Sequence, residues 1–237
     1  MNFTFNINNN YSLIPPYAVM ILLSLFFGNV VMYILNIKNG IRKNVAGYTI
    51  LLSPMMSIFC GICMAYITSG FRYYGLSSIG GLIGMYLAVL VMSIINHNKK
   101  DMKIMFQNCT LVLPLMYALS KTGCFLAGCC YGIKYRGIFS VYYTGHGNIP
   151  EYNVFPVQLV ESIIFFLIFV IGMFLYRYKS KNIIQIEFIV SALSKLLLDF
   201  LRESHNGQLI SLNQIFCIIL VIIAIFSKRI IKKLGIF

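Results

Sequence analysis

The chain has 237 residues, of which 59% are hydrophobic and only 11% are charged, and its mean hydropathy is +0.82. A soluble core cannot absorb that much apolar surface, so the composition excludes an ordinary soluble enzyme and indicates an integral membrane protein. The formal net charge of +13 is also typical of nucleic-acid-binding proteins. The sequence offers no soluble basic face with groups that read bases, so no nucleic acid is expected as a partner.

Seven apolar stretches approach the roughly 20 residues that a helix needs to cross the hydrocarbon core of a bilayer. In chain order they are Pro15–Leu35, Tyr48–Ser69, Ile79–Asn96, Ile104–Ser120, Val154–Tyr176, Ile183–Leu201 and Ser211–Phe226. The fourth and the seventh are short, so their ends are the least well defined. The pattern predicts a single polytopic membrane domain over residues 1–237, an all-α bundle of about seven transmembrane helices.

Most of the 19 lysines and arginines follow the first, third, fifth and seventh stretches. They are Lys38, Arg42, Lys43, Lys99, Lys100, Lys103, Arg177, Lys179, Lys181, Lys228, Arg229, Lys232 and Lys233. Because basic loops stay in the cytoplasm, the N-terminus is expected outside and the C-terminus inside. The same residues are expected to contact anionic membrane lipids. Residues 1–12 contain no Lys or Arg and are expected to form a short polar external tail.

The longest segment on the expected outer side covers residues 121–153. It is expected to be rich in loop, and it carries the run Gly123–Gly132, which contains three cysteines and three glycines and lies just after Lys121. Such a run is suited to holding backbone and polar groups close to a ligand at the membrane surface. Function is therefore expected in this segment and in the outer half of the bundle.

Three of the seven cysteines, Cys124, Cys129 and Cys130, lie in this segment. A disulfide from Cys124 to one of the other two is favoured, because adjacent cysteines rarely bond each other without strain and an extracytoplasmic site permits the bond. A reactive thiolate near Lys121 is the alternative. A zinc site would need a fourth ligand such as His146, and the C-x4-C-C pattern is a weak zinc signal, so no metal ligands are predicted.

The remaining cysteines lie within the apolar stretches, where a thiol packs as a small apolar group. They are Cys60, Cys63, Cys109 and Cys217. Cys60 and Cys63 form a C-x-x-C pair at mid-depth of the second stretch, which favours packing over redox chemistry.

Charged residues also occur inside the apolar stretches. Lys195 and Asp199 are four residues apart and share a helix face, so they form either a mutual ion pair or an anion-binding lysine oriented by the carboxylate. The two interpretations are compatible. Gln158 and Glu161 share a face of the fifth stretch, where Glu161 requires a cation, and a polar clamp between helices is as good an interpretation as catalysis.

These charges converge near the expected outer interface. The cations are Lys121, Arg136, Lys195 and Arg202, and the balancing carboxylates are Glu161, Asp199 and Glu203. Fixed ammonium and guanidinium groups stabilise phosphate charge, so the phosphate ester of a lipid headgroup is the predicted ligand. Gly80 and Gly81 open the third stretch and serve either close helix packing or anion binding through free N–H groups.

Five segments of the chain, in the same order, resemble the prolipoprotein diacylglyceryl transferase family. Ser120–Gly132 reads Ser-Lys-Thr-Gly-Cys-Phe-Leu-Ala-Gly-Cys-Cys-Tyr-Gly, which is similar to the family's Gly-Arg-x-Gly-Asn-Phe-x-Asn-Gly-Glu-x-x-Gly. Phe155–Glu161 is similar to His-Pro-x-Gln-Leu-Tyr-Glu. Pro16–Ala18, Gly80–Gly84 and Lys195–Arg202 resemble the family's Trp-Tyr-Gly, Gly-Gly-Leu-Ile-Gly and Arg-x-x-x-Glu-Phe-x-Arg.

The resemblance implies an enzyme of the bacterial cytoplasmic membrane that moves the diacylglyceryl group of phosphatidylglycerol to the lipobox cysteine thiol of a preprolipoprotein signal peptide, releasing glycerol phosphate. It implies no metal and no organic cofactor. The implied catalytic residues are Lys121, Glu161, Lys195, Asp199 and Arg202, with the cations serving the phosphate and the carboxylates orienting them or taking the proton. The implied substrate-binding residues are Tyr17, Gly80, Gly81, Cys124, Gly128, Cys129, Gly132, Gln158 and Arg136.

The chain departs from the family pattern at several positions. Ile79, Lys121, Cys124, Cys129, Phe155 and Lys195 stand where the family has His, Arg, Asn, Glu, His and Arg. A histidine base is therefore expected only if His146 or His205 folds into the site. Two alternatives stay open: a non-catalytic or differently specific lipid-binding paralogue, and a membrane thiol–disulfide carrier that uses Cys60 and Cys63 with the loop cysteines.

Overall fold

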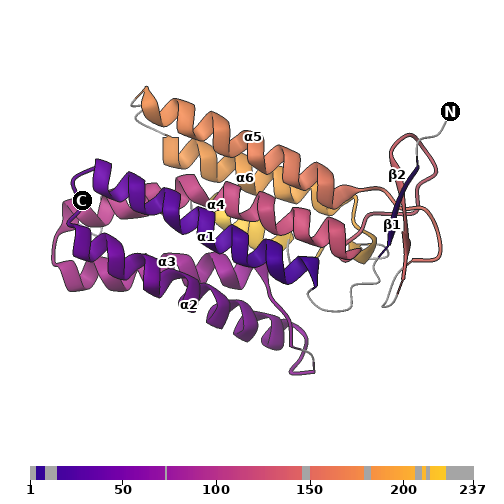
Figure 1. Ribbon diagram of the computed structural model, residues 1–237, viewed down its shortest axis with the longest axis horizontal. Helices are drawn as coiled ribbons and strands as arrows, with labels where there is room; N and C mark the ends of the chain where they lie inside the picture. Colours follow the sequence, from indigo (N-terminus) through magenta and orange to yellow (C-terminus); the bar gives the residue numbers. More distant parts are fainter. Residues whose placement is uncertain are drawn as a thin grey trace. The chain divides into compact units, whose positions relative to one another are not determined.

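The computed structural model describes residues 4–8, 15–72, 74–145, 150–178, 183–205, 210–211 and 214–222. Over these ranges the chain is mostly helical (Figure 1). The elements are β1 (Thr4–Asn8), α1 (Pro16–Lys38), α2 (Lys43–Thr68), α3 (Ser78–Asn96), α4 (Lys99–Ala127), β2 (Ser140–Thr144), α5 (Val157–Arg177), α6 (Ile183–Asp199) and the 3-10 turn η1 (Glu203–His205). Residues 214–222 are also helical.

The helices agree with the apolar pattern of the sequence. The first six predicted spans coincide with α1 to α6, and within the described residues α1 to α5 are long and apolar enough to cross a membrane. The seventh predicted span is helical over residues 214–222; Ser211 lies before this helix, and the rest of the predicted span lies outside the described residues. A helical membrane protein is confirmed, whereas the count of seven spans and the orientation of the termini stay predictions.

The expected loop after Ser120 was wrong for its first residues, because α4 continues to Ala127. The helix ends in a Schellman motif at Gly128, whose φ of +68° is accessible to glycine at little cost. The amide of Gly128 donates to the carbonyl of Phe125 (3.4 Å), and the amide of Cys129 donates to the carbonyl of Cys124 (3.1 Å). Lys121 and Cys124 are therefore held on a helix rather than on a loop.

The expected polar tail at the N-terminus is partly a strand. β1 pairs in parallel with β2, with Thr4 opposite Ser140 and Asn8 opposite Thr144. The inward side chains of β2 form a small core with a neighbouring loop, made of Val141, Tyr143 and Val154. The Tyr143 hydroxyl donates to the carbonyl of Phe125 at 3.1 Å, which ties this strand pair to the end of α4.

The chain divides into two compact units. The first contains Met1–Ser24 and Pro114–Ile225, and it therefore holds β1, the start of α1, the second half of α4, β2, α5 and α6. Within it α5 and α6 run side by side (Figure 1). Ala118 of α4 packs with Phe165 and Ile168 of α5, and Tyr117 lies against the same cluster. These contacts hold three helices together around the candidate site.

The second unit contains Leu25–Leu113, in which α2 and α3 pack closely. A Cβ atom on Gly80 would collide with the carbonyl oxygen of Cys60, and one on Gly84 would collide with that of Met56. The amide of Gly80 donates to the Ser77 hydroxyl, and the amide of Gly81 donates to the Ser77 carbonyl. Gly80 and Gly84 thus allow close packing of α3 against α2, and the amides of Gly80 and Gly81 both donate to Ser77 at the start of α3.

Candidate functional site

The candidate site of the first unit is built around the carboxylate of Glu161, which is fully buried on α5. Lys195 Nζ lies 2.5 Å from Glu161 Oε1, and Lys121 Nζ lies 3.0 Å from Oε2. Arg202 Nη2 donates to Oε2 at 3.4 Å. The Tyr117 hydroxyl donates to Oε1 at 3.2 Å, so four donors from three parts of the chain converge on one side chain.

Helical spacing explains why these groups meet. Tyr117 and Lys121 are four residues apart on α4, so both point to the same side of that helix. The two ammonium groups lie over the face of the Tyr117 ring, with Lys121 Nζ 5.1 Å and Lys195 Nζ 5.6 Å from its centroid. A ring in this position attracts both cations.

Asp199 is the second carboxylate of the cluster. Its Oδ1 atom lies 3.7 Å from Lys195 Nζ and 3.7 Å from Arg202 Nη1. Its Oδ2 atom accepts a hydrogen bond from the Ser211 hydroxyl. Both carboxylates are thus shared between cations, which is how a protein keeps buried charges paired.

The cluster carries an excess of positive charge. Lys121, Lys195 and Arg202 supply three cations, while Glu161 and Asp199 supply two carboxylates, so one positive charge is in excess when all five groups are ionised. Lys121 is only 3% exposed. Among the described residues, Arg202 Nε is a buried donor with no hydrogen-bond partner. A buried site with a spare cation and a spare donor is suited to a singly charged anion such as a phosphodiester.

Arg202 is held by the loop that follows α4. The backbone of Gly132 forms an antiparallel bridge with Arg202, and the amide of Ile133 donates to the carbonyl of Leu201 at 3.0 Å. A Cβ atom on Gly132 would lie 2.6 Å from the carbonyl oxygen of Phe155 and 2.8 Å from that of Leu201. Gly132 therefore serves the close approach of three backbone segments beside the guanidinium.

Gln158 and the start of α1 lie next to the turn that carries the cysteines. Gln158 is buried one turn before Glu161, and its amide donates to the carbonyl of Cys129 at 2.8 Å. A Cβ atom on Gly123 of α4 would lie 2.8 Å from Met20 Cβ and 3.4 Å from Tyr17 Cα of α1, so α1 and α4 approach closely here. The Tyr17 side chain lies within electrostatic reach of the three neighbouring thiols.

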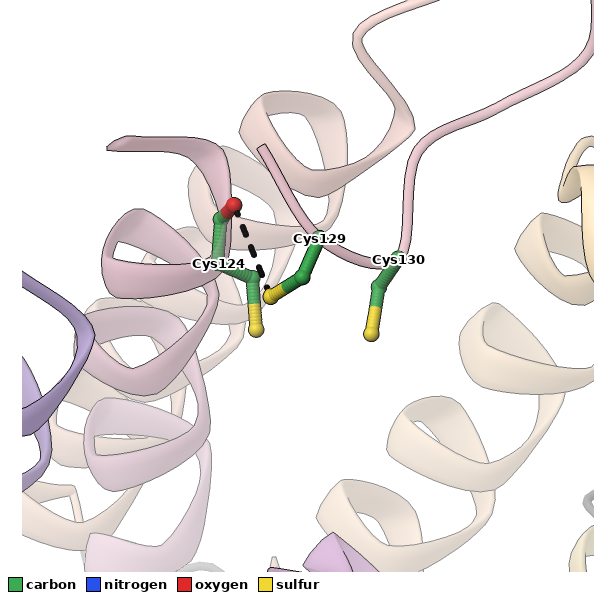
Figure 2. A group of neighbouring side chains, drawn as sticks. All are labelled: Cys124, Cys129 and Cys130. Atoms are coloured by element: carbon green, nitrogen blue, oxygen red, sulfur yellow. Dashed lines mark hydrogen bonds between the residues drawn. The ribbon is translucent and has the colours of Figure 1, made fainter. Parts of the chain in front are cut away.

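The three thiols at the end of α4 are free, so the expected disulfide is absent among the described cysteines. The Sγ atoms of Cys124, Cys129 and Cys130 all lie within 4.8 Å of one another, and Figure 2 shows the three side chains side by side, with the Cys129 thiol turned toward Cys124. Hydrogen bonds from the Cys124 and Cys129 thiols lower the pKa of the Cys130 thiol, and the charges of Lys121 and Arg202 act in the same direction.

Some predicted residues do not join this cluster. Arg136 is exposed on the loop before β2, and no ion pair involving it is found in the described part of the chain. Glu203 does not balance the cations: it accepts a hydrogen bond from the Tyr152 hydroxyl, which raises the pKa of Tyr152 to about 12. Gly80 and Gly81 belong to the second unit. His146 lies outside the described residues.

Sequence reasoning missed three polar groups of the first unit. Tyr117 was overlooked, although its position four residues before Lys121 signals a shared helix face. Ser211 was taken only as the start of a span, yet it bonds Asp199. Glu187 of α6 was not singled out: it is buried against Gly172, and both its carboxylate oxygens have no hydrogen-bond partner among the described residues.

Comparisons with known proteins agree with the arrangement of these residues along the chain. Residues 5–228 match the family described as prolipoprotein diacylglyceryl transferase. The chain is 30% identical over 169 residues to the phosphatidylglycerol–prolipoprotein diacylglyceryl transferase of Clostridium tetani (strain Massachusetts / E88), which is 67% of this chain and 63% of that protein. It is 29% identical over 178 residues to the phosphatidylglycerol–prolipoprotein diacylglyceryl transferase 2 of Clostridium perfringens (strain 13 / Type A), covering 70% of this chain and 64% of that relative. The chain thus spans less than two thirds of the length of these curated relatives.

Proposed function

Because the chain belongs to the prolipoprotein diacylglyceryl transferase family, we propose that it transfers the diacylglyceryl group of phosphatidylglycerol to the thiol of a lipobox cysteine in a preprolipoprotein, releasing glycerol phosphate. The names of its relatives mention phosphatidylglycerol and prolipoprotein. The observation that carries the proposal is the buried cluster around Glu161, with three cations against two carboxylates.

The reaction has one electrostatic requirement that this cluster meets. A carbon–sulfur bond forms at the glyceryl carbon while the bond from that carbon to a phosphate oxygen breaks, and the phosphate leaves with the electron pair. The phosphate gains a negative charge in this step, so cations that are already fixed in place lower the barrier. Lys121, Lys195 and Arg202 are the proposed cations, and Arg202 can offer two parallel donors to the phosphate oxygens.

Glu161 and Asp199 have a positioning role in this proposal. In the absence of phosphate they neutralise the three cations, which otherwise repel one another in a buried place. When a phosphodiester enters, the excess positive charge and the spare Arg202 Nε donor are available to it. Tyr17, Gln158, Gly128 and Gly132 shape the adjoining turn, and we place the headgroup and the acceptor thiol between that turn and the cations.

The proposed setting is the bacterial cytoplasmic membrane, with seven spans, the N-terminus outside and the C-terminus inside. The gathering of basic residues after alternate apolar stretches supports this orientation. On the proposed cytoplasmic side, a pocket of the second unit is lined by Arg42, Lys43, Tyr48 and Asn96. Two cations above an apolar wall fit the headgroup of an anionic membrane lipid.

The experiment that tests the function is a transfer assay. Purified protein in detergent receives phosphatidylglycerol labelled in its diacylglyceryl group, together with a lipobox peptide or the same peptide with its cysteine replaced by serine. Label on the cysteine peptide alone, with glycerol phosphate released, supports the proposal. Headgroup release without peptide label points to a different acceptor. Lipid binding without turnover favours a lipid-binding paralogue instead.

A further inference from the structure

The three thiols at the end of α4 are arranged as a set of metal ligands. Their Sγ atoms lie within 4.8 Å of one another, and none of them is in a disulfide. A zinc ion holds thiolates at about 2.3 Å in tetrahedral geometry, which places sulfur atoms roughly 3.8 Å apart. The observed upper limit of 4.8 Å is about 1 Å above that spacing.

The backbone brings these thiols together by two separate local features. In the Schellman motif the residue three before the end of the helix faces the second residue beyond it, and these positions hold Cys124 and Cys129. Cys130 has a φ of +58°, which is uncommon for a residue with a side chain, and in this conformation its thiol lies within 4.8 Å of the other two. Such a conformation persists only where the surroundings impose it, and it is frequent at ligand sites.

The surrounding charges fit a metal-bound set of thiolates. Three thiolates around a divalent ion carry a net charge of −1, and Lys121 and Arg202 lie within electrostatic reach of Cys130. Without a metal, three ionised thiols at this distance repel one another. A divalent ion removes most of this repulsion, because the bound set then retains a net charge of only −1.

We propose that Cys124, Cys129 and Cys130 bind a thiophilic divalent ion, zinc by its chemistry, and that the open fourth position takes the acceptor thiol. This inference rests on the proposed function. Three protein ligands and one open position are the pattern of a catalytic rather than a structural zinc site. A thiol that coordinates such an ion is deprotonated, which is what thioether formation requires of the acceptor.

The acceptor S–H loses its proton to water when its sulfur binds the ion. A sulfur electron pair then forms the bond to the glyceryl carbon, while the bond from that carbon to the phosphate oxygen breaks. The phosphate retains that pair and departs as glycerol phosphate beside Lys121, Lys195 and Arg202, and the neutral thioether leaves the ion.

The site is tested first by metal binding alone. The full chain is purified in detergent under reducing conditions and loaded with Zn²⁺ or with Co²⁺, whose thiolate complexes absorb in the near ultraviolet. We expect one ion per chain and a cobalt–thiolate band. Loss of a side chain that only hydrogen-bonds to a metal ligand typically weakens metal binding by roughly 10–100-fold. Loss of a ligand itself should weaken metal binding by more than this in each of the variants Cys124→Ser, Cys129→Ser and Cys130→Ser. Cys60→Ser, in the second unit, is the matched control and should bind as the wild type does.

The open position is tested with the cobalt-loaded protein. A lipobox peptide with its cysteine should shift the cobalt spectrum, and the serine peptide should not. No cobalt band in the folded wild-type protein, or a thiol titration that finds Cys124 bonded to Cys129 or Cys130, would overturn the site. If chelated protein still transfers lipid at full rate, the metal inference fails and the proposed function stands. If metal binds but no lipid is ever transferred, the site stands and the proposed function fails.

Discussion

At the residue scale, the site depends on the contrast between two buried carboxylates on neighbouring helices. Glu161 is surrounded by Lys121, Lys195 and Arg202, whereas Glu187 lies against Gly172 with both oxygens unpartnered among the described residues. Both are buried, so exposure does not separate them. The two carboxylates differ in charge pairing, so replacement by glutamine is expected to have opposite effects on stability at the two positions.

Glu161→Gln removes a carboxylate that three cations share. Breaking a buried ion pair from one side typically costs about 3–5 kcal/mol, because the remaining charges are left uncompensated. We expect a clear drop in the melting temperature of the detergent-solubilised protein. Glu187→Gln is the matched control: it replaces an unpaired buried carboxylate by a neutral amide and should leave the melting temperature unchanged or higher. Equal losses in the two variants would contradict the pairing.

At the element scale, Gly132 allows the loop after α4 to lie close to Arg202 of the charged cluster. Gly132→Ala introduces a Cβ atom 2.6 Å from the Phe155 carbonyl oxygen and 2.8 Å from that of Leu201. Backbone atoms cannot rotate away as a flexible side chain does, so the bridge to Arg202 should open. We expect lower stability and at least a tenfold loss of transfer, which is about 1.4 kcal/mol of transition-state stabilisation.

Gly47→Ala is the control for that substitution. Gly47 lies within α2, has no atom within 4 Å of an added Cβ, and does not have a positive φ. Alanine favours a helix interior over glycine by roughly 0.5–1 kcal/mol, so this variant should keep its activity and melt no lower than the wild type. A loss of transfer in Gly47→Ala similar to that in Gly132→Ala would remove the steric explanation.

The helices were predictable from the sequence because long apolar runs determine where they form. The six longest apolar runs became α1 to α6, because a helix is the usual way for a chain to bury its backbone polar groups in a membrane. The strand β1 was not foreseen, since five residues gain their structure only from pairing with Ser140–Thr144, far along the chain. The helical end of α4 was missed because Gly123 resembles a helix breaker in the sequence but serves packing against Met20.

The charged residues of the candidate site were predictable from the sequence, whereas their pairing was not. Lys195 and Asp199 stood out because charges within an apolar run are costly and rarely lack a partner. The choice of Glu161 as the shared partner of three cations, and of Tyr117 beneath them, depends on how α4, α5 and α6 pack. The closeness of the three thiols depends on the motif that ends α4 and on the positive φ of Cys130. The spacing of the cysteines in the sequence predicts neither feature.

At the scale of the whole molecule, we predict that the N-terminus lies outside the cytoplasm and the C-terminus inside it. A reporter that is active only outside the cytoplasm should be inactive when fused after Phe237 and active when inserted in residues 133–139. A reporter that fluoresces only in the cytoplasm should give the opposite result, because basic residues follow alternate apolar stretches. Activity of the external reporter at both positions would contradict the predicted odd number of spans between residues 133–139 and the C-terminus.

We propose that the cations around Glu161 receive the phosphate of phosphatidylglycerol, and the first measurement to make is the rate of transfer to a lipobox peptide by the Arg202→Ala variant. Arg177→Ala, which removes an exposed guanidinium at the end of α5, is the matched control. Loss of an electrostatic donor to a developing charge typically costs about 100–1000-fold in rate. We expect a loss of that size for Arg202→Ala in a folded protein and a normal rate for Arg177→Ala. If folded Arg202→Ala transferred lipid as fast as Arg177→Ala, the cations around Glu161 would not be the phosphate site.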